Sequence, residues 1–115
     1  MSLPSIPRAL RETATTAGMD YVVASRDGLV IDSSLPHPDC DSCAAMVAVL
    51  LKSAEEALKR SGRRGEVDFV MVSAGDGVVT AAKAGDYYVA LVHDGRHKGL
   101  ALLILNRLRR ALFRE

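Results

Sequence analysis

The chain has 115 residues, of which 49% are hydrophobic, and this suits one domain that spans residues 1–115 and packs around one core. Its formal net charge of +1 gives no reason to expect nucleic acid or an anionic membrane as its partner. No apolar run approaches the roughly 20 residues that cross a bilayer, and the N-terminus shows no export signal. The two cysteines do not make a disulfide framework. We therefore expect a cytoplasmic protein that does not insert into a membrane.

A helix and a hairpin are predicted at the start of the chain. Prolines within residues 4–7 suit the first turn of a helix, and Gly18 suits its end. Residues 21–25 and 29–33 are then short, apolar and rich in β-branched side chains. The Asp-Gly pair between them favours a tight turn, because glycine accepts a positive φ. These residues therefore predict an antiparallel hairpin.

A long helix is predicted to follow the proline-containing loop at residues 33–41. Asp39 or Asp41 is suited to cap its first turn, where a negative charge also favours the helix N-terminus. The helical pattern runs to about Ser61, and Gly62 is a natural stop. The helix predicted from Asp41 to Ser61 would thus be the longest element of the chain.

Turning this helix by 100° per residue separates an apolar arc from a charged side. The charged side contains Lys52, Glu55, Glu56, Lys59 and Arg60. The predicted buried arc consists of Cys40, Cys43, Met46, Val47, Leu50, Leu51, Ala54, Ala57 and Leu58. Ala45, Ala48 and Val49 fall on the polar side and make a second, small-residue apolar patch. Such a patch is typical either of an interface or of scattered exposed residues without a role.

Three further strands and a final helix complete the predicted order αββαβββα. The strands are residues 67–73, 78–83 and 87–93, joined by glycine-containing turns, and the helix begins near residues 96–99. The strands are apolar along most of their length, which indicates that both faces of the sheet are covered. We therefore predict an α/β (α+β) fold with three α/β/α layers and a five-stranded antiparallel sheet.

Cys40 and Cys43 carry the only motif of chemical interest. Two thiols three residues apart at a helix N-terminus suit a redox couple, or part of a zinc site with His37 as a third ligand. A second cysteine pair that would complete a zinc site is absent from the sequence. Both sulfurs also fall on the predicted buried arc, which favours structural thiols. No other pattern predicts catalytic residues or a cofactor.

The layout resembles the roadblock/LC7 family over nearly the whole chain. The resemblance rests on the hairpin SRDGLVI, on the long alanine-rich helix soon after it, and on the strands VSAGDGVVTAAKAGDYYVALV. It implies the profilin-like variant of the predicted fold. It also implies homodimers or heterodimers in which the strand at residues 67–73 pairs with its copy and the long helices pack side by side. The residues expected at that interface are Val67, Phe69, Val70, Met71, Val72, Ser73 and Ala48.

The resemblance also implies a function, because bacterial and archaeal members are similar to regulators of Ras-like small GTPases. Eukaryotic members serve dynein and lysosomal signalling scaffolds. The helix face expected to contact the GTPase consists of Ser42, Ala45, Val49, Lys52, Ser53 and Glu56. An inserted arginine, from Arg26 or Arg96, is a conceivable route to faster hydrolysis.

Three functions remain open on the sequence alone. The first is a noncatalytic, homodimeric adaptor or regulator of a small GTPase, with no cofactor. The second is a small thiol-redox or metal-binding protein that uses Cys40 and Cys43. The third is a ligand-sensing domain of the related longin or profilin-like shape, which would require an internal pocket.

Overall fold

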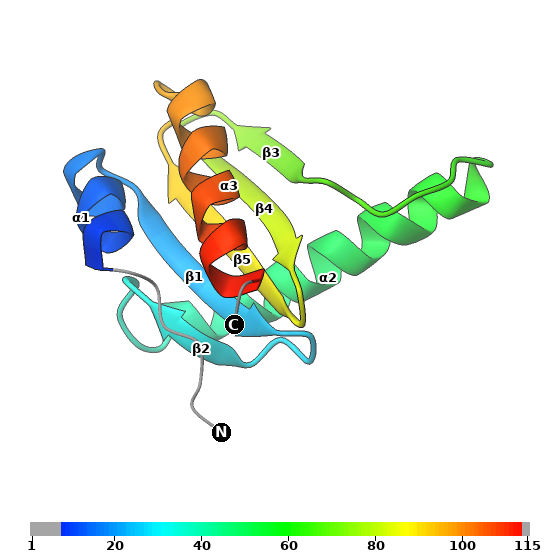
Figure 1. The fold of residues 1–115 in the computed structure, drawn as a ribbon, viewed down its shortest axis with the longest axis horizontal. Helices are drawn as coiled ribbons and strands as arrows, with labels where there is room; N and C mark the ends of the chain where they lie inside the picture. Colours follow the sequence, from blue (N-terminus) through cyan, green and yellow to red (C-terminus); the bar gives the residue numbers. More distant parts are fainter. Residues whose placement is uncertain (1–7, 114–115) are drawn as a thin grey trace.

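The computed structural model describes the backbone of residues 8–113 and, within them, all side chains except those of residues 8–10, 13, 108 and 111–113. The predicted start of the first helix, at residues 4–7, lies outside the described residues. The elements follow the predicted order (Figure 1). They are α1 (Arg8–Thr16), β1 (Asp20–Ser25), β2 (Val30–Ser33), α2 (Asp39–Arg60), β3 (Val70–Ala74), β4 (Gly77–Ala84), β5 (Tyr87–His93) and α3 (Lys98–Phe113).

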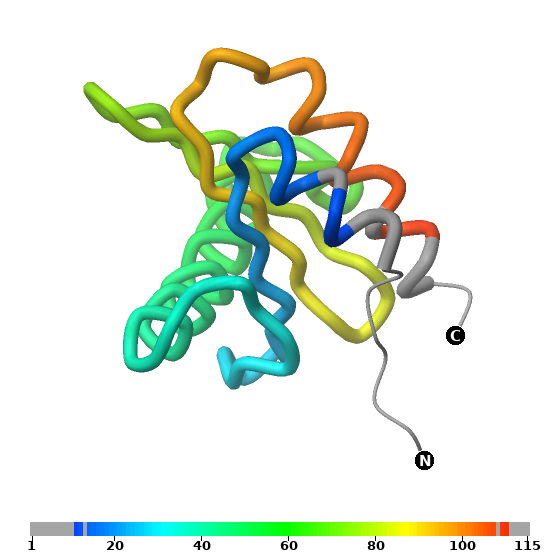
Figure 2. The backbone as a smooth tube through the Cα atoms, turned by 90° about the vertical axis from the view of Figure 1, so that its left-hand side faces the viewer, coloured from blue at the N-terminus to red at the C-terminus, as the bar shows by residue number. Residues whose placement is uncertain are grey.

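The strands form one antiparallel sheet in the order β2-β1-β5-β4-β3. Helix α2 covers one face of the sheet, and α1 and α3 cover the other (Figure 2). Each face has its own buried cluster: Val23, Leu91 and Ile104 belong to the one beneath α3, and Val22 and Leu51 to the one beneath α2. The predicted three-layer fold with both sheet faces covered is confirmed. No helix within residues 8–113 has the length and apolar character needed to cross a membrane.

The turn of the β1–β2 hairpin lies against α2. The Ser25 N–H donates a hydrogen bond to the Leu29 carbonyl over 2.8 Å, and Gly28 completes the turn with a φ of +84°. A Cβ on Gly28 would lie 3.1 Å from Ala45 Cα and 3.5 Å from Ala48 Cβ. Glycine is therefore required here both by the backbone conformation and by the close approach of the helix.

Helix α2 is rotated relative to the orientation predicted from its apolar arc. Ala48 is only 4% exposed, so its placement on the polar side is wrong, whereas Met46, predicted to be buried, is 62% exposed. The cause is the contact with the hairpin, because only small side chains fit beneath a backbone turn. The buried residues of the helix are Cys40, Ala44, Val47, Ala48 and Leu51.

The second half of α2 projects beyond the sheet (Figure 1). All of its buried residues lie between Cys40 and Leu51, and Leu58 is 42% exposed although the predicted arc buries it. The helix stops as predicted at Gly62, whose φ is +84° and whose N–H donates to the Lys59 carbonyl. The predicted aspartate cap is wrong, since Asp39 and Asp41 lie inside the helix and no side chain that the structure describes caps its N-terminus.

Strand β3 begins at Val70, three residues later than predicted. Val67 lies instead in the buried cluster beneath α2, at 6% exposure. The register pairs Val70 with Ala81, so a longer strand would place Asp68 opposite Lys83. The Lys83 carbonyl instead accepts a hydrogen bond from Arg109 Nε over 3.0 Å. Arg109 of α3 therefore occupies the Lys83 carbonyl, which lies opposite Asp68 in the longer register.

Candidate functional site

Strand β3 lies at one edge of the sheet and pairs with β4 alone among the described strands. Val70 and Met71 are half-buried, Ser73 is exposed, and the large side chains of Phe69 and Val72 are 48% and 45% exposed. An exposed edge of this kind presents unpaired N–H and C=O groups together with apolar side chains. The edge is therefore a candidate interface, and pairing with a second copy stays a prediction.

The outward face of α2 is the second candidate surface. All of the residues predicted to contact a GTPase are exposed there: Ser42, Ala45, Val49, Lys52, Ser53 and Glu56. Val49 is 53% exposed, which is high for a large apolar side chain. Whether these residues bind a partner stays a prediction, but their accessibility is consistent with one.

Met46 adds an exposed apolar side chain that the helical periodicity did not place on the surface. At 100° per residue it lies about 160° around the helix from Ala48. Because Ala48 faces the β1–β2 turn, Met46 lies on the flank of α2 that faces away from this hairpin. Ala48 itself has almost no accessible surface with which to contact a second copy.

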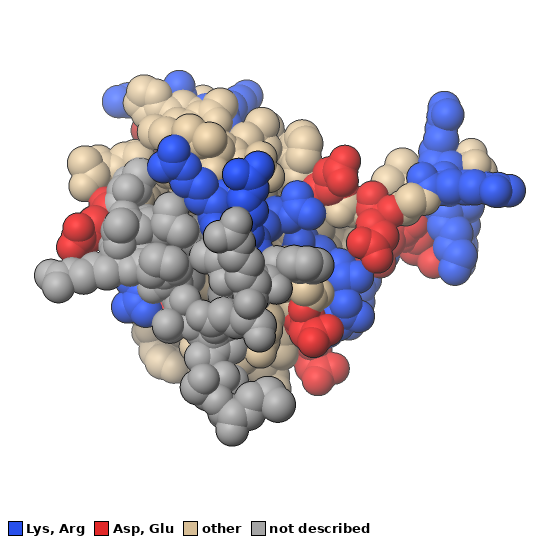
Figure 3. Space-filling view, viewed as in Figure 1, with Lys and Arg blue, Asp and Glu red and all other residues tan. Residues whose placement is uncertain are grey.

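Val70 and Val72 of β3 lie on the same face of the sheet as α2. Val70 packs against the cluster beneath α2, and Val72 has the same orientation because side chains alternate along a strand. The two ends of α2 differ in charge: Asp39 and Asp41 lie in the first turn, and Lys59 and Arg60 lie in the last. Basic side chains gather at the projecting end of the molecule (Figure 3). One side of the protein thus combines an open strand edge, exposed apolar side chains and a helix with oppositely charged ends.

The loop before α2 brings His37, Cys40 and Asp41 together, with ligand atoms that all lie within 4.8 Å of one another. His37 Nδ1 lies 2.9 Å from Asp41 Oδ2, and both side chains are exposed. Asp41 was predicted only as a cap. Its spacing of four residues from His37 is the sequence signal that indicates the contact.

Cys43, which the sequence groups with Cys40 and His37, does not belong to this cluster. Its side chain is half-buried against the cluster beneath α2. Burial raises the pKa of the Cys43 thiol, and the negative charge of the nearby Asp20 carboxylate raises it further. A protonated thiol is a poor nucleophile, so this environment disfavours a dithiol couple, the alternative to structural thiols.

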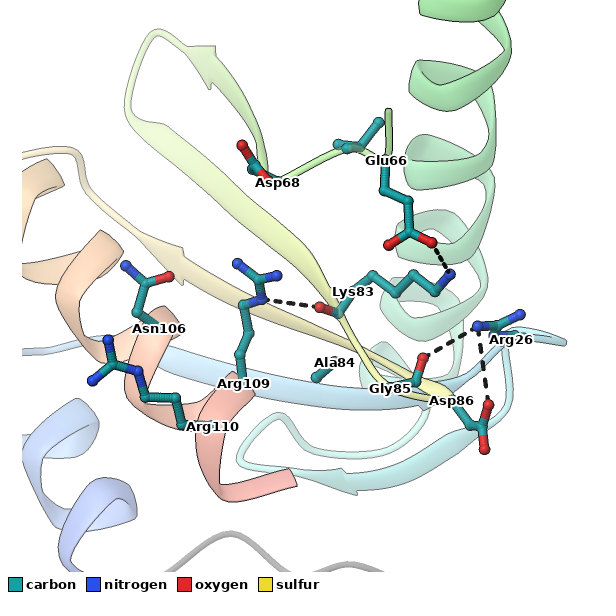
Figure 4. A pocket seen from close by; sticks show the side chains of 11 residues that line it. Arg26, Glu66, Asp68, Lys83, Ala84, Gly85, Asp86, Asn106, Arg109 and Arg110 are labelled. Atoms are coloured by element: carbon teal, nitrogen blue, oxygen red, sulfur yellow. Dashed lines mark hydrogen bonds and ion pairs between the residues drawn. The ribbon is translucent and has the colours of Figure 1, made fainter. Parts of the chain in front are cut away.

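A hollow of about 810 Å³ opens between α3, the end of β4 and the segment that leads into β3 (Figure 4). Some of its polar groups contact one another: Lys83 Nζ lies 3.5 Å from Glu66 Oε1, and Arg26 donates to the Gly85 carbonyl over 3.2 Å. The sequence did not indicate this hollow. The hollow is lined by Val67 and Asp68, which were predicted to belong to β3 but lie outside the sheet. Its lining residues are Arg26, Glu66, Val67, Asp68, Lys83, Ala84, Gly85, Asp86, Asn106, Arg109 and Arg110.

His93 is buried and hydrogen-bonded within the fold. It is 6% exposed, and its Nδ1 accepts a hydrogen bond of 3.1 Å from the Gly95 N–H. The remaining proton therefore sits on Nε2, which lies 3.1 Å from Thr80 Oγ1 and donates to it. Burial lowers the pKa of His93, against the opposing effect of Asp94, while Lys98 lowers it further. The imidazole is neutral and joins β5 to β4 and to the turn before α3.

Comparison with known proteins places this geometry in a family. The model of the Roadblock/LC7 domain matches residues 8–94. A Roadblock/LC7 domain from Streptomyces avermitilis shares 23% identity at a TM-score of 0.76, with 80% of this chain and 79% of that chain covered. The gliding protein MglB from Thermus thermophilus shares 21% identity at a TM-score of 0.77, with 98% of this chain and 96% of that chain covered.

The likeness extends to profilin II of Acanthamoeba castellanii, at 18% identity and a TM-score of 0.64, with 88% of this chain and 89% of that chain covered. A search of the curated proteins gave no match. At these identities the solved structures show the shared fold, and the profilin-like architecture predicted above is confirmed. Because the family model spans most of the chain, the protein belongs to the Roadblock/LC7 domain family.

Proposed function

We propose that this protein is a noncatalytic, homodimeric adaptor that binds a Ras-like small GTPase and modulates its activity or its location. The observation that carries the proposal is the combination, on one side of the molecule, of the open β3 edge with the exposed apolar residues of α2. Membership of the Roadblock/LC7 family supports it, because this family supplies regulators and scaffolds of that kind. Its two free cysteines suit a reducing compartment, and we place the protein in the cytoplasm.

Two copies that join through β3 would continue the sheet across a twofold axis. Pairing would satisfy the exposed backbone groups of residues 70–74 and cover Val72. A twofold axis perpendicular to the sheet reverses the direction of every strand and helix that lies parallel to the plane of the sheet. The two α2 helices would therefore run antiparallel, with Met46 on the flank nearest to the second copy.

The charge distribution of α2 is complementary to such an arrangement. In an antiparallel pair, the end with Asp39 and Asp41 approaches the end with Lys59 and Arg60 of the second copy. Opposite charges then meet at both ends of the helix pair, whereas a parallel pair would place like charges together. The projecting half of α2, with Leu58 exposed, would gain a surface to pack against.

The GTPase would bind the outward face of α2 around Val49, with Ser42 and Glu56 towards its two ends. A contact here acts by holding or reshaping the partner, since an inserted arginine is not favoured by the environments of the two candidates. Arg26 donates to the Gly85 carbonyl, and Arg96 Nε lies 3.4 Å from the Asp94 carboxylate. Each guanidinium therefore already has a partner within its own chain.

The proposal is tested by purifying the tagged protein from its native cells with GDP, or with a non-hydrolysable GTP analogue, in the buffer. We expect a Ras-like GTPase in the bound fraction, with recovery that depends on the nucleotide. Binding and GTP hydrolysis are then measured with the purified pair. If the pair does not associate with either nucleotide, the proposed function is wrong.

A further inference from the structure

The thiol of Cys40 is buried at the N-terminal end of α2. It is 5% exposed, yet it belongs to neither of the two apolar clusters. Its sulfur lies within 4.8 Å of the ligand atoms of His37 and Asp41. A nitrogen, a sulfur and an oxygen donor thus converge at one point where the loop meets α2.

We propose that His37, Cys40 and Asp41 bind one zinc ion per chain. Imidazole nitrogen, thiolate sulfur and carboxylate oxygen are the ligands that zinc takes in proteins. Three protein ligands leave the fourth tetrahedral position for water. The inference does not depend on the proposed function, because it rests only on these side chains.

The distances require only small movements of the ligands. Zinc–ligand bonds of about 2.0–2.3 Å place neighbouring ligand atoms of a tetrahedral site about 3.3–3.6 Å apart. The contact of 2.9 Å between His37 and Asp41 would open slightly, and the atoms that are up to 4.8 Å apart would move inwards. The side chains of His37 and Asp41 are 73% and 53% exposed, so both have room to adjust.

The charges at this point also suit a divalent cation. The thiolate of Cys40 and the carboxylate of Asp41 together balance the two positive charges of zinc. Both ligands lie in the first turn of α2, where the partial positive charge of the helix N-terminus is compatible with negatively charged ligands. Bound zinc would fasten the preceding loop to α2 directly before Ser42, where the outward face of the helix begins.

The test uses the metal-free, reduced chain titrated with zinc alone against a chromophoric chelator. We expect one zinc per chain, and cobalt in its place should give a thiolate-to-metal charge-transfer band. His37→Asn and Asp41→Asn should each lower the zinc affinity about tenfold or more, since even outer partners of a metal site are worth that much. Affinity should fall as the pH falls, because protons compete for the ligands.

Two matched variants separate this site from the rest of the loop. Asp39→Asn removes an exposed carboxylate from the same turn, and Cys43→Ser removes the other thiol; both should keep the wild-type affinity. Because Cys40 is buried, the two exposed ligands carry the test, and circular dichroism checks that each variant is folded. The inference is overturned if the wild type binds no zinc, if either control weakens binding as much as Asp41→Asn, or if His37→Asn leaves the affinity unchanged.

Discussion

Gly28 in the β1–β2 turn lies directly against Ala45 of α2, so close that a Cβ on Gly28 would be 3.1 Å from Ala45 Cα. This contact sets which side of α2 faces the sheet. It buries Ala48 beside the turn and turns the flank that carries Met46 towards solvent. The surfaces proposed to bind a second copy and a GTPase are consequences of this one packing arrangement.

Replacing Gly28 with alanine should lower the free energy of unfolding more than the same change at Gly62. Both glycines have a φ of +84°, but an added Cβ at Gly62 meets no atom within 4 Å. Gly62→Ala should therefore cost about 1–2 kcal/mol of backbone strain. Gly28→Ala should cost about 1–3 kcal/mol more, since the neighbouring atom belongs to the helix backbone. Urea denaturation of the two variants checks this, and equal losses would show that the contact is unimportant.

The order of the elements was predictable from local signals alone. The hairpin followed from its turn glycine, and the end of α2 followed from Gly62. Strand β5 was predicted over the residues that it occupies. The strands contain uninterrupted apolar residues, and this predicted that helices cover both faces of the sheet. A sheet with one face in water would instead have alternating apolar and polar residues. These features depend on residues close together in the chain.

The features that were missed depend on contacts between distant residues. Hydropathy favours burying Met46 over Ala48, but the approach of a backbone turn reverses that order. The apolar pattern predicted Val67 as the start of a strand. Its side chain instead packs in the cluster beneath α2, and pairing with β4 begins only at Val70. The contact between Asp41 and His37 was missed because the aspartate was assigned to a cap.

Val72→Lys should weaken the proposed dimer. Val72 is 45% exposed at the middle of the β3 edge, and a lysine on an edge strand opposes pairing. We expect the dimer dissociation constant to rise about tenfold or more, equivalent to about 1.4 kcal/mol. Leu103→Lys is the matched control, because Leu103 is 49% exposed on α3, on the opposite face of the sheet. If both variants dissociate like the wild type on dilution, β3 is not the interface.

Val49→Asp should weaken binding of the GTPase without changing the mass of the dimer. Val49 lies on the outward face of α2 and is 53% exposed, so the change should leave the fold intact. An aspartate at a central apolar contact would be buried without a partner, which should cost about 2 kcal/mol or more. Calorimetry with the purified partner measures the loss, with Leu103→Asp as the control. If Val49→Asp binds the GTPase with unchanged affinity, the GTPase does not bind the outward face of α2.

The stability of the protein should fall as the pH is lowered below the ordinary histidine value of 6.5. Burial lowers the pKa of His93 in the folded state. Between this lowered pKa and 6.5, the histidine is therefore protonated in the unfolded chain but not in the folded chain, which favours unfolding. The effect fades as the pH rises through 6.5 and levels off once the pH is below the folded pKa. Protonation would also place a hydrogen on Nδ1, which accepts from the Gly95 N–H.

His93→Asn isolates this contribution, because asparagine keeps a polar side chain but does not titrate. We expect the loss of unfolding free energy between pH 7.5 and pH 5 to be smaller in this variant than in the wild type. His97→Asn, which changes an exposed histidine close by, should behave like the wild type. A wild-type and a His93→Asn protein with the same pH dependence would show that burial of this imidazole has no effect on stability.

Sedimentation equilibrium of the wild-type protein at micromolar concentration tests the central claim most directly. The chain has a mass of 12.3 kDa, and two copies joined through β3 and α2 would sediment at twice that mass. A mass of 12.3 kDa across the whole micromolar range would mean that the β3 edge stays open in solution. It would contradict the shared surface on which the proposed function depends.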